Sequence, residues 1–230
     1  AALRQAEPPQ SPKMKTWQIP CVKIEDHTRF RWRGLMLDTG RCFHTKEQVK
    51  RHIDQLAFHK MNVLHLHLSD EPGWRMESKK YPKLTDIGAW PDRKKETWRG
   101  GYHTQDDIRE LVAYAASRYV MIVPEIEIPS HAHTMAMKRS YPEILECGGP
   151  GAGLCMGNEE TLQLIEGVIG ELAELFPSPF FHLGGDEGEW SLCAKHAEKF
   201  GGKRDAAIPW KRLKEFLAAK NRKMMTWGPI

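Results

Sequence analysis

The stretch Phe180-Phe181-His182-Leu183-Gly184-Gly185-Asp186-Glu187 begins as a short apolar strand, passes two glycines and ends in two adjacent carboxylates. Side chains alternate faces along a regular strand, so neighbouring acids reach one ligand only where the backbone leaves strand geometry. Gly184 and Gly185 permit that departure. Two carboxylates this close repel when both are ionised, which raises the proton affinity of one and suits the acid-base cleavage of an acetal. The alternative is that Asp186 caps a following helix and Glu187 is a solvated acid of its first turn.

The same pattern, an apolar strand that ends in ionisable or aromatic residues, recurs along the chain. Strands are expected at 33–38, 61–68, 119–124, 180–183 and 223–227, with amphipathic helices between them that open at Thr45, Thr104, Asn158 and Pro209. Such alternation predicts a parallel sheet with crossover helices. The residues at the carboxyl ends are Asp38, Asp70, Glu125 with Glu127, Asp186 with Glu187, and Trp227. A (β/α)8 barrel keeps its active site at these ends.

The predicted fold class is therefore α/β, a (β/α)8 TIM barrel of which about the first five βα units are present. A barrel needs eight strands and typically about 250 residues, whereas the predicted strands here already reach the end of the chain. Residues 1–30 are rich in proline and show no sustained period, which indicates a linker or the tail of a preceding domain. Residues 31–230 form the partial barrel domain in this interpretation.

The composition limits the classes of function. With 40% hydrophobic and 28% charged residues, the chain of 230 residues is typical of a globular protein. The net charge is +4, and basic and acidic residues are interspersed along the chain, which does not indicate nucleic acid binding. No apolar run approaches the roughly 20 residues of a spanning helix, and residues 1–20 lack the apolar centre of a signal peptide. The cysteines form no CxxC pair, which argues against structural zinc, and leave open whether Cys147 and Cys155 form a disulfide.

Six motifs, in this order along the chain, carry a resemblance to a known family. They are "RGLMLDTGRCF" at 33–43, "NVLHLHLSDEPGWRMES" at 62–78, "VPEIEIPSHA" at 123–132, "LCMGNEET" at 154–161, "HLGGDE" at 182–187 and "MMTWG" at 224–228. Together they resemble glycoside hydrolase family 20, the β-N-acetylhexosaminidases, over residues 17–230. "ALRQ" near the start also resembles the end of the α/β domain that precedes the barrel in this family.

The resemblance implies a retaining exo-glycosidase that removes terminal β-linked N-acetylglucosamine or N-acetylgalactosamine without a cofactor or metal. The substrate's own acetamido carbonyl is the nucleophile and an oxazolinium ion is the intermediate. Glu187 is then the general acid and base, and Asp186 orients the acetamido group. Arg33 is expected to bind the sugar hydroxyls, and Trp227 to line the wall around the acetamido methyl.

The resemblance further implies a supporting polar network of Asp70, Glu127, His131, His182 and Asp38. Glu127 stands where many members have Asp, Ser130 where many have Gly, and Gly228 where an acid often follows the tryptophan. The expected partner is an oligosaccharide or glycoconjugate with a terminal β-N-acetylhexosamine. By analogy with the family, the expected location is periplasmic, secreted or lysosomal. The natural aglycone and the oligomeric state stay open.

Two other interpretations are carried alongside. His65 and His67 share one face of a strand, and with His131, His182 and Asp186 they are similar to the metal ligands of barrel amidohydrolases. Alternatively, if the missing strands complete the sugar pocket, the chain alone is an inactive truncated remnant.

Overall fold

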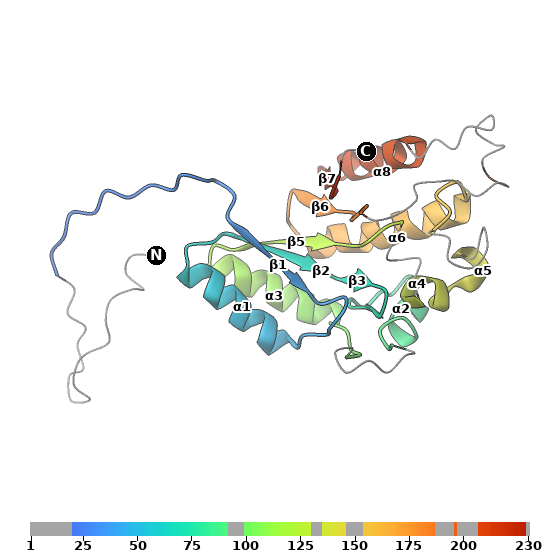
Figure 1. Ribbon diagram of the computed structural model, residues 1–230, viewed down its shortest axis with the longest axis horizontal. Coiled ribbons are helices and arrows are strands. Elements are labelled where there is room, and N and C mark those ends of the chain that lie inside the picture. Colours follow the sequence, from blue (N-terminus) through green and yellow to red (C-terminus); the bar gives the residue numbers. More distant parts are fainter. Residues whose placement is uncertain are drawn as a thin grey trace.

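The centre of the molecule is a parallel sheet in which sequential strands are neighbours. The computed structural model describes residues 20–91, 99–129, 135–145, 154–186, 196 and 207–228. Its main sheet has the order β1-β2-β5-β6-β7, with all pairs parallel (Figure 1). The strands are β1 (Gly34–Asp38), β2 (Val63–His67), β5 (Met121–Glu125), β6 (Phe180–His182) and β7 (Lys223–Met225). The predicted α/β class with a parallel sheet is confirmed.

The crossover helices form one continuous layer. They are α1 (Lys46–Phe58), α3 (Gln105–Ser117), α6 (Glu159–Leu175) and α8 (Ala207–Ala219). Each contacts the next in the same order as the strands, so all four lie on one side of the sheet. In Figure 1, α1 and α3 run side by side below β1, β2 and β5. Sequential strands whose crossovers all lie on one side are the arrangement of a barrel wall, because right-handed crossovers then curl the sheet one way.

Three of the helices begin at the predicted caps. Thr45 and Thr104 each form a reciprocal capping box, with Gln48 and Asp107 respectively. The Asn158 side chain accepts a hydrogen bond from the backbone nitrogen of Glu160 at the start of α6. These side chains satisfy backbone N–H groups that have no partner within the helix, so the sequence alone specifies where these helices start. The last helix, α8, begins at Ala207, two residues before the predicted Pro209.

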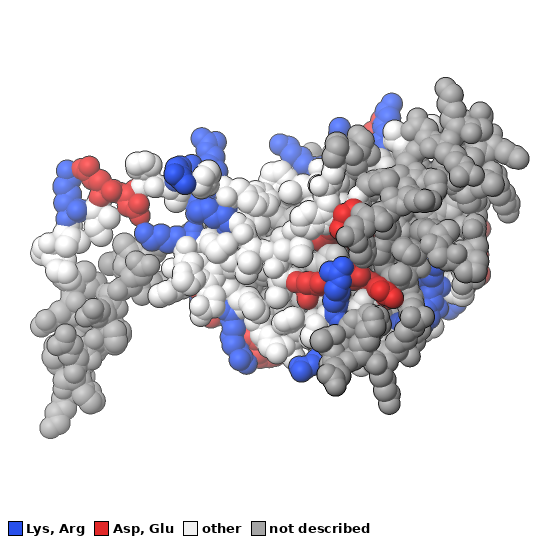
Figure 2. All heavy atoms as spheres, viewed as in Figure 1, with Lys and Arg blue, Asp and Glu red and all other residues white. Residues whose placement is uncertain are grey.

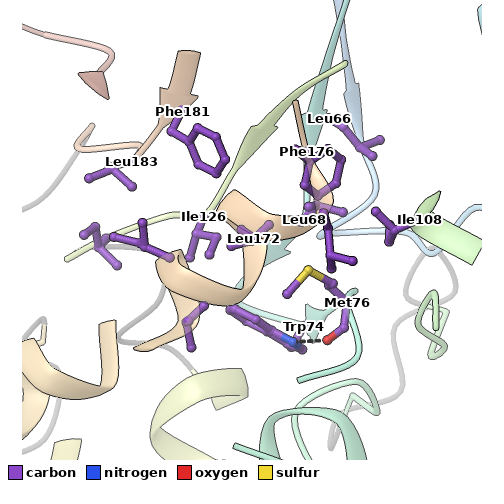
Figure 3. Packing of buried hydrophobic residues seen from close by; sticks show 14 of the residues in the cluster. Leu66, Leu68, Trp74, Met76, Ile108, Ile126, Leu172, Phe176, Phe181 and Leu183 are labelled. Atoms are coloured by element: carbon purple, nitrogen blue, oxygen red, sulfur yellow. Dashed lines mark hydrogen bonds between the residues drawn. The ribbon is translucent and has the colours of Figure 1, made fainter. Parts of the chain in front are cut away.

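The hydrophobic core lies between the sheet and the helix layer. Alternation along β2 turns Leu64, Leu66 and Leu68 toward the helices, where they join Ile126 from the end of β5. Figure 3 shows Leu66, Leu68, Ile126, Phe181 and Leu183 converging with Leu172 and Phe176 of α6 and its end. The residues between these apolar positions therefore face the inner side of the sheet, away from the helices.

The two long connections contain more structure than the sequence indicated. Residues 71–103 include β4 (Gly73–Trp74), which pairs with β3 (Ser69–Asp70), and α2 (Lys83–Asp86). The Trp74 ring is buried and belongs to the core (Figure 3), whereas Trp90 is exposed. The second connection includes α4 (Met135–Ser140) and α5 (Pro142–Leu145). Short elements of this kind have too few residues to show a period.

Residues 20–32 precede the sheet as an exposed, extended segment that leaves the body of the molecule (Figure 1). The division into a segment 1–30 and a domain 31–230 stays a prediction. None of the helices in the described part of the chain combines the length and apolar character that a membrane crossing needs.

Candidate active site

The register of the sheet brings polar residues into one row at the carboxyl ends of the strands. Asp38 of β1 pairs with His67 of β2, His67 with Glu125 of β5, and Glu125 with His182 of β6. Paired residues of parallel strands point to the same face, so these four side chains share the inner face. Glu125 and the two histidines are buried, and Asp38 is partly buried. Burying such a row of polar side chains costs free energy unless its members form hydrogen bonds or ion pairs with one another.

Glu125 is the centre of the row. Its Oε2 lies 2.7 Å from Nδ1 of His67, and its Oε1 lies 2.9 Å from Nδ1 of His182. The indole Nε1 of Trp227 donates to Oε1 at 2.8 Å. His65 Nε2 lies 2.8 Å from Oε2, although its direction does not make a hydrogen bond. The sequence had marked Glu125 only as a strand-end acid, and the register alone reveals that it joins three strands.

These contacts set the charges of the row. Burial disfavours the ionised form of Glu125, but the surrounding histidines outweigh burial and hold its pKa well below the ordinary value. Burial likewise lowers the pKa of His67, but hydrogen bonds to Asp70 and Glu125 raise it to about 10. His67 is therefore a cation and Glu125 an anion at neutral pH, and the two form a buried ion pair.

Glu127 shapes the turn that carries the first of the two acids. Its Oε1 accepts a hydrogen bond of 2.8 Å from the backbone nitrogen of Gly185. Gly184 and Gly185 have φ values of +66° and +89°, and a Cβ on Gly184 would lie 2.0 Å from the Glu127 carboxylate. Only glycine fits there without strain. Burial and the charges of Glu125 and Asp186 raise the pKa of Glu127 to about 9, so it is a neutral acid at pH 7.

Trp227 lies beside the same turn. Its backbone nitrogen donates to the carbonyl oxygen of Gly184 at 3.0 Å, which joins the end of β7 to the turn before Asp186. The indole ring centroid is 4.7 Å from that of His182 and 5.4 Å from that of His65. The Trp227 residue is still 48% exposed, so it offers an apolar surface on the inner face, beside the turn that leads to Asp186.

Arg41, which sequence reasoning missed, adds the cation of the site. Its Nη1 lies 2.8 Å from Asp38 Oδ2, and its Nη2 lies 3.0 Å from Asp70 Oδ2. About half of the side chain is exposed, at 51%. Partial burial lowers the pKa of Arg41, but Asp38, Asp70 and Asp186 outweigh burial and raise it. Figure 2 shows acidic and basic side chains gathered in the middle of the face, over the carboxyl end of β1. The available signal was the position of Arg41 in the turn that follows a predicted strand ending in Asp38.

Arg33, which the resemblance led us to expect at the sugar, does not lie in this group. It precedes β1, whose first residue Gly34 pairs with the first residue of β2, so it lies at the amino end of the sheet. Its side chain donates to the carbonyl oxygens of Lys60 at 2.7 Å and Phe30 at 2.5 Å. The strand of five residues separates Arg33 from the carboxyl end, where Asp186 lies.

The other predicted residues are placed as follows. Asp70 accepts from His67 Nε2 at 3.1 Å and joins Arg41 to the row. Burial raises the pKa of Asp70, but His67, the backbone of Glu71 and Arg41 outweigh burial and lower it.

Glu187 and His131 lie outside the described residues, as do Ser130, Cys147 and Cys193. Cys155 is buried, with its Sγ 3.4 Å from Nδ1 of His196.

Two groups in the row have the composition of metal ligands. His65, Glu125 and His182 form one group, and His67, Glu125 and Glu127 form the other, each with ligand atoms within 4.8 Å of one another. Glu125 belongs to both groups, and its carboxylate already pairs with His67 and His182. The predicted shared face of His65 and His67 is confirmed, but their common partner is a carboxylate.

Comparison with known proteins places this geometry in a family. Residues 30–230 match the profile of glycosyl hydrolase family 20, catalytic domain. A β-hexosaminidase of Porphyromonas gingivalis is 36% identical over 92% of this chain and 30% of its own length. A β-hexosaminidase of Vibrio furnissii is 41% identical over 75% of this chain and 32% of its own length. The chain thus spans about a third of these curated relatives.

Solved structures agree. The crystal structure of a β-N-acetylhexosaminidase from Bacteroides fragilis superposes with a TM-score of 0.83 at 34% identity, covering 94% of this chain and 44% of the other. An exo β-N-acetylglucosaminidase from Vibrio harveyi, in complex with N-acetylglucosamine, gives 0.77 at 33% identity, covering 88% and 36%. These matches overturn the alternative of a metal-dependent amidohydrolase. The chain belongs to glycoside hydrolase family 20, and its parallel sheet is part of that family's catalytic TIM barrel.

Proposed function

We propose that this chain supplies the acid pair and the acetamido pocket of a β-N-acetylhexosaminidase. The substrate is a glycan or glycoconjugate that ends in β-linked N-acetylglucosamine or N-acetylgalactosamine. The observation that carries the proposal is that the half-exposed Trp227 is tied by its backbone nitrogen to the carbonyl oxygen of Gly184, in the turn that leads to the Asp186 carboxylate. An acetamido group needs both features: a carboxylate accepts its N–H, and an apolar wall receives its methyl.

The proposed reaction uses the substrate as its own nucleophile. Glu187 donates a proton to the glycosidic oxygen while the acetamido carbonyl oxygen attacks the anomeric carbon, so the bond to the aglycone breaks and an oxazolinium ion forms. Asp186 accepts the acetamido N–H and stabilises the positive charge. Glu187, now a carboxylate, takes a proton from water as the water attacks the anomeric carbon and reopens the ring. An intramolecular nucleophile gains from proximity only when its conformer is held, which is the role of Asp186.

Arg41 is proposed to bind the sugar hydroxyls in place of Arg33. Its guanidinium is held at the carboxyl end of the sheet by Asp38 and Asp70, and half of it stays open to solvent. A planar fork of N–H donors suits adjacent hydroxyl groups. The row from Asp70 through His67 to Glu125 connects this arginine to the Trp227 indole.

The test is hydrolysis of 4-nitrophenyl β-N-acetylglucosaminide and the matching galactosaminide by the complete gene product that contains these residues. Glu187→Gln and Asp186→Asn are each expected to lower kcat by about 100-fold or more. The control substrate is 4-nitrophenyl β-glucoside, which has the same leaving group and no acetamido nucleophile, and it should not be cleaved. Equal cleavage of glucoside and glucosaminide, or full activity of both variants, contradicts the proposal.

The proposal includes a location in which such glycans are degraded: the periplasm, the cell exterior or a lysosome. Cell fractionation with activity measured in each fraction tests this part. Activity found only in the cytosolic fraction contradicts it.

A further inference from the structure

Arg75 is a buried cation that the proposed reaction does not use. It follows β4 directly and is fully buried. Its Nε donates to Thr39 O at 2.9 Å and to Gly40 O at 3.3 Å, and its Nη2 donates to Gly40 O at 2.9 Å. Its Nη1 donates to Ala89 O at 2.8 Å and to Gly101 O at 3.0 Å. All of these acceptors are backbone carbonyls, and no carboxylate in the described part of the chain forms an ion pair with it.

The turn that Arg75 contacts is also held from the opposite side. The backbone nitrogens of Thr39 and Gly40 donate to His67 O at 3.1 and 3.0 Å, and the Thr39 hydroxyl donates to the same oxygen at 2.6 Å. The peptide groups of this turn thus have their N–H groups fixed by β2 and their carbonyls fixed by Arg75. The next residue in the chain is Arg41.

Two glycines provide the space for this arrangement. A Cβ on Gly40 would lie 2.9 Å from the Asp70 Cβ, so the turn packs closely against the residue that holds Arg41. A Cβ on Gly73 would lie 2.1 Å from Cζ of Arg75, so Gly73 makes room for the guanidinium itself. Both the turn and the guanidinium are therefore confined to one position.

We infer that Arg75 is a positioning residue, which sets the Thr39–Gly40 turn and through it the place of the Arg41 guanidinium against the sugar. The inference rests on the proposed function for the role of Arg41. A buried charge without a counter-ion is costly, and packing alone does not require one. The planar guanidinium donates hydrogen bonds to carbonyl oxygens on three separate segments at once, which the single nitrogen of a lysine cannot do. Burial lowers the pKa of Arg75 only to about 10, so the group keeps its charge and all its donors at neutral pH.

A double-mutant cycle tests this inference in the complete gene product. Arg75→Lys, Arg41→Ala and the double variant are compared on a fluorogenic 4-methylumbelliferyl β-N-acetylglucosaminide. Arg75→Lys is expected to lower kcat/KM about tenfold, mainly through KM, when Arg41 is present, because residues of one network are coupled. With Arg41 already replaced by alanine, the same change should lower kcat/KM by less than about twofold. A tenfold loss in both backgrounds means that Arg75 serves the fold as a whole and overturns the inference.

A matched control and a second variant remove the ambiguity of a damaged fold. Arg222→Lys is the control, because Arg222 also donates to backbone carbonyls, those of Ala173 and Phe176, but just before β7 at the other end of the sheet. It should leave KM unchanged. Gly73→Ala displaces the Arg75 guanidinium without removing it and should raise KM as Arg75→Lys does. An unchanged KM in a folded Gly73→Ala variant contradicts the inference.

One readout does not depend on turnover. The side-chain Nε–H signal of Arg41, assigned by its loss in Arg41→Lys, is expected to shift in the NMR spectrum of Arg75→Lys and not in that of Arg222→Lys. If the unaltered protein does not cleave the substrate, the proposed function fails while this signal still decides the inference. An unshifted Arg41 signal in Arg75→Lys overturns it.

Discussion

At the scale of single residues, the inner face of the sheet contains buried side chains of opposite charge that lie in direct contact. Glu125 is fully buried, and such a carboxylate is costly without partners. Here His67 supplies the compensating charge, and His182 and Trp227 lie against the other oxygen. Glu127, two residues further, is kept neutral instead, so that it adds no third charge of the same sign near Asp186. Among the described residues, the site thus combines a cationic His67 between the buried carboxylates of Glu125 and Asp70 with one protonated acid, Glu127.

The neutral state of Glu127 predicts a pH dependence of stability. Its pKa is raised from 4.5 to about 9 in the folded protein, so the folded state holds a proton that the unfolded state releases above pH 4.5. Stability therefore falls as pH rises through this window. Glutamine mimics the neutral acid and can still accept from Gly185. Melting temperatures of Glu127→Gln measured from about pH 5 to pH 8 should fall less steeply than those of the unaltered protein.

The raised pKa of His67 acts in the same direction but leaves this comparison intact. Its stabilising contribution is fully present below pH 6.5 and is lost as pH rises toward about 10, in both proteins. Glu174→Gln, on the exposed side of α6, is the control and should follow the unaltered curve. Parallel curves for Glu127→Gln and the unaltered protein show that Glu127 is ionised and contradict the assignment.

At the scale of elements, local capping residues determine where the helices begin, and packing against the sheet determines which of their faces is buried. The capping boxes at Thr45 and Thr104 are complete in the structure, and both helices begin where the sequence predicted. Both helices then present an apolar stripe to the core, with Ile53 and Leu56 in α1 and Ile108 and Leu111 in α3. Accurate helix starts matter here because each crossover delivers the next strand to the sheet in a fixed register.

The cap of α3 gives the second prediction. The Thr104 hydroxyl accepts from Asp107 N at 3.0 Å, and Asp107 Oδ2 accepts from Thr104 N at 3.1 Å. Thr104→Ala removes the first of these bonds and should lower the free energy of unfolding by about 1 kcal/mol. Urea denaturation followed by circular dichroism measures the change. Thr28→Ala, in the exposed segment before the sheet, should change it far less. An equal effect of both variants contradicts the capping role.

At the scale of the whole molecule, the described sheet has β1 at one edge and β7 at the other. Leu35 and Met36 of β1 are 48% and 40% exposed, although they point to opposite faces of the strand. Both are uncovered because no strand of the described residues pairs with the free side of β1. An edge strand with apolar side chains is a template for pairing with another chain.

The third prediction follows from this edge. The chain of 230 residues should self-associate as its concentration rises, and Met36→Lys should reduce the association because a charge on an edge strand opposes pairing. Sedimentation velocity over a concentration series measures the effect. Gln55→Lys adds the same charge on the exposed face of α1 and is the control. If both variants associate as the unaltered chain does, β1 is not the contact.

Much of this fold was predictable because its signals are local. Period two along β2 and period 3.6 along α1 and α3 depend on neighbouring residues only, and so do the caps. The sequence did not predict the placement of side chains that depends on which end of a strand a residue occupies. Arg33 and Arg41 stand on either side of the same short strand, and the structure shows that only Arg41 follows the carboxyl end. The short elements α2, α4 and α5 were missed because four to six residues do not display a period.

By itself, the sequence determined the alternation of strands and helices, the glycine turn before Asp186 and, through its motifs, the family. The tertiary structure alone decided the register, and with it the contacts of His67, His182 and Trp227 with the Glu125 carboxylate. It also decided that Arg75 reaches the turn before Arg41 from more than 30 residues away. The physical reason is that backbone propensity acts over a few residues, whereas partners of a buried charge are chosen by distance in space, which only the packed sheet defines.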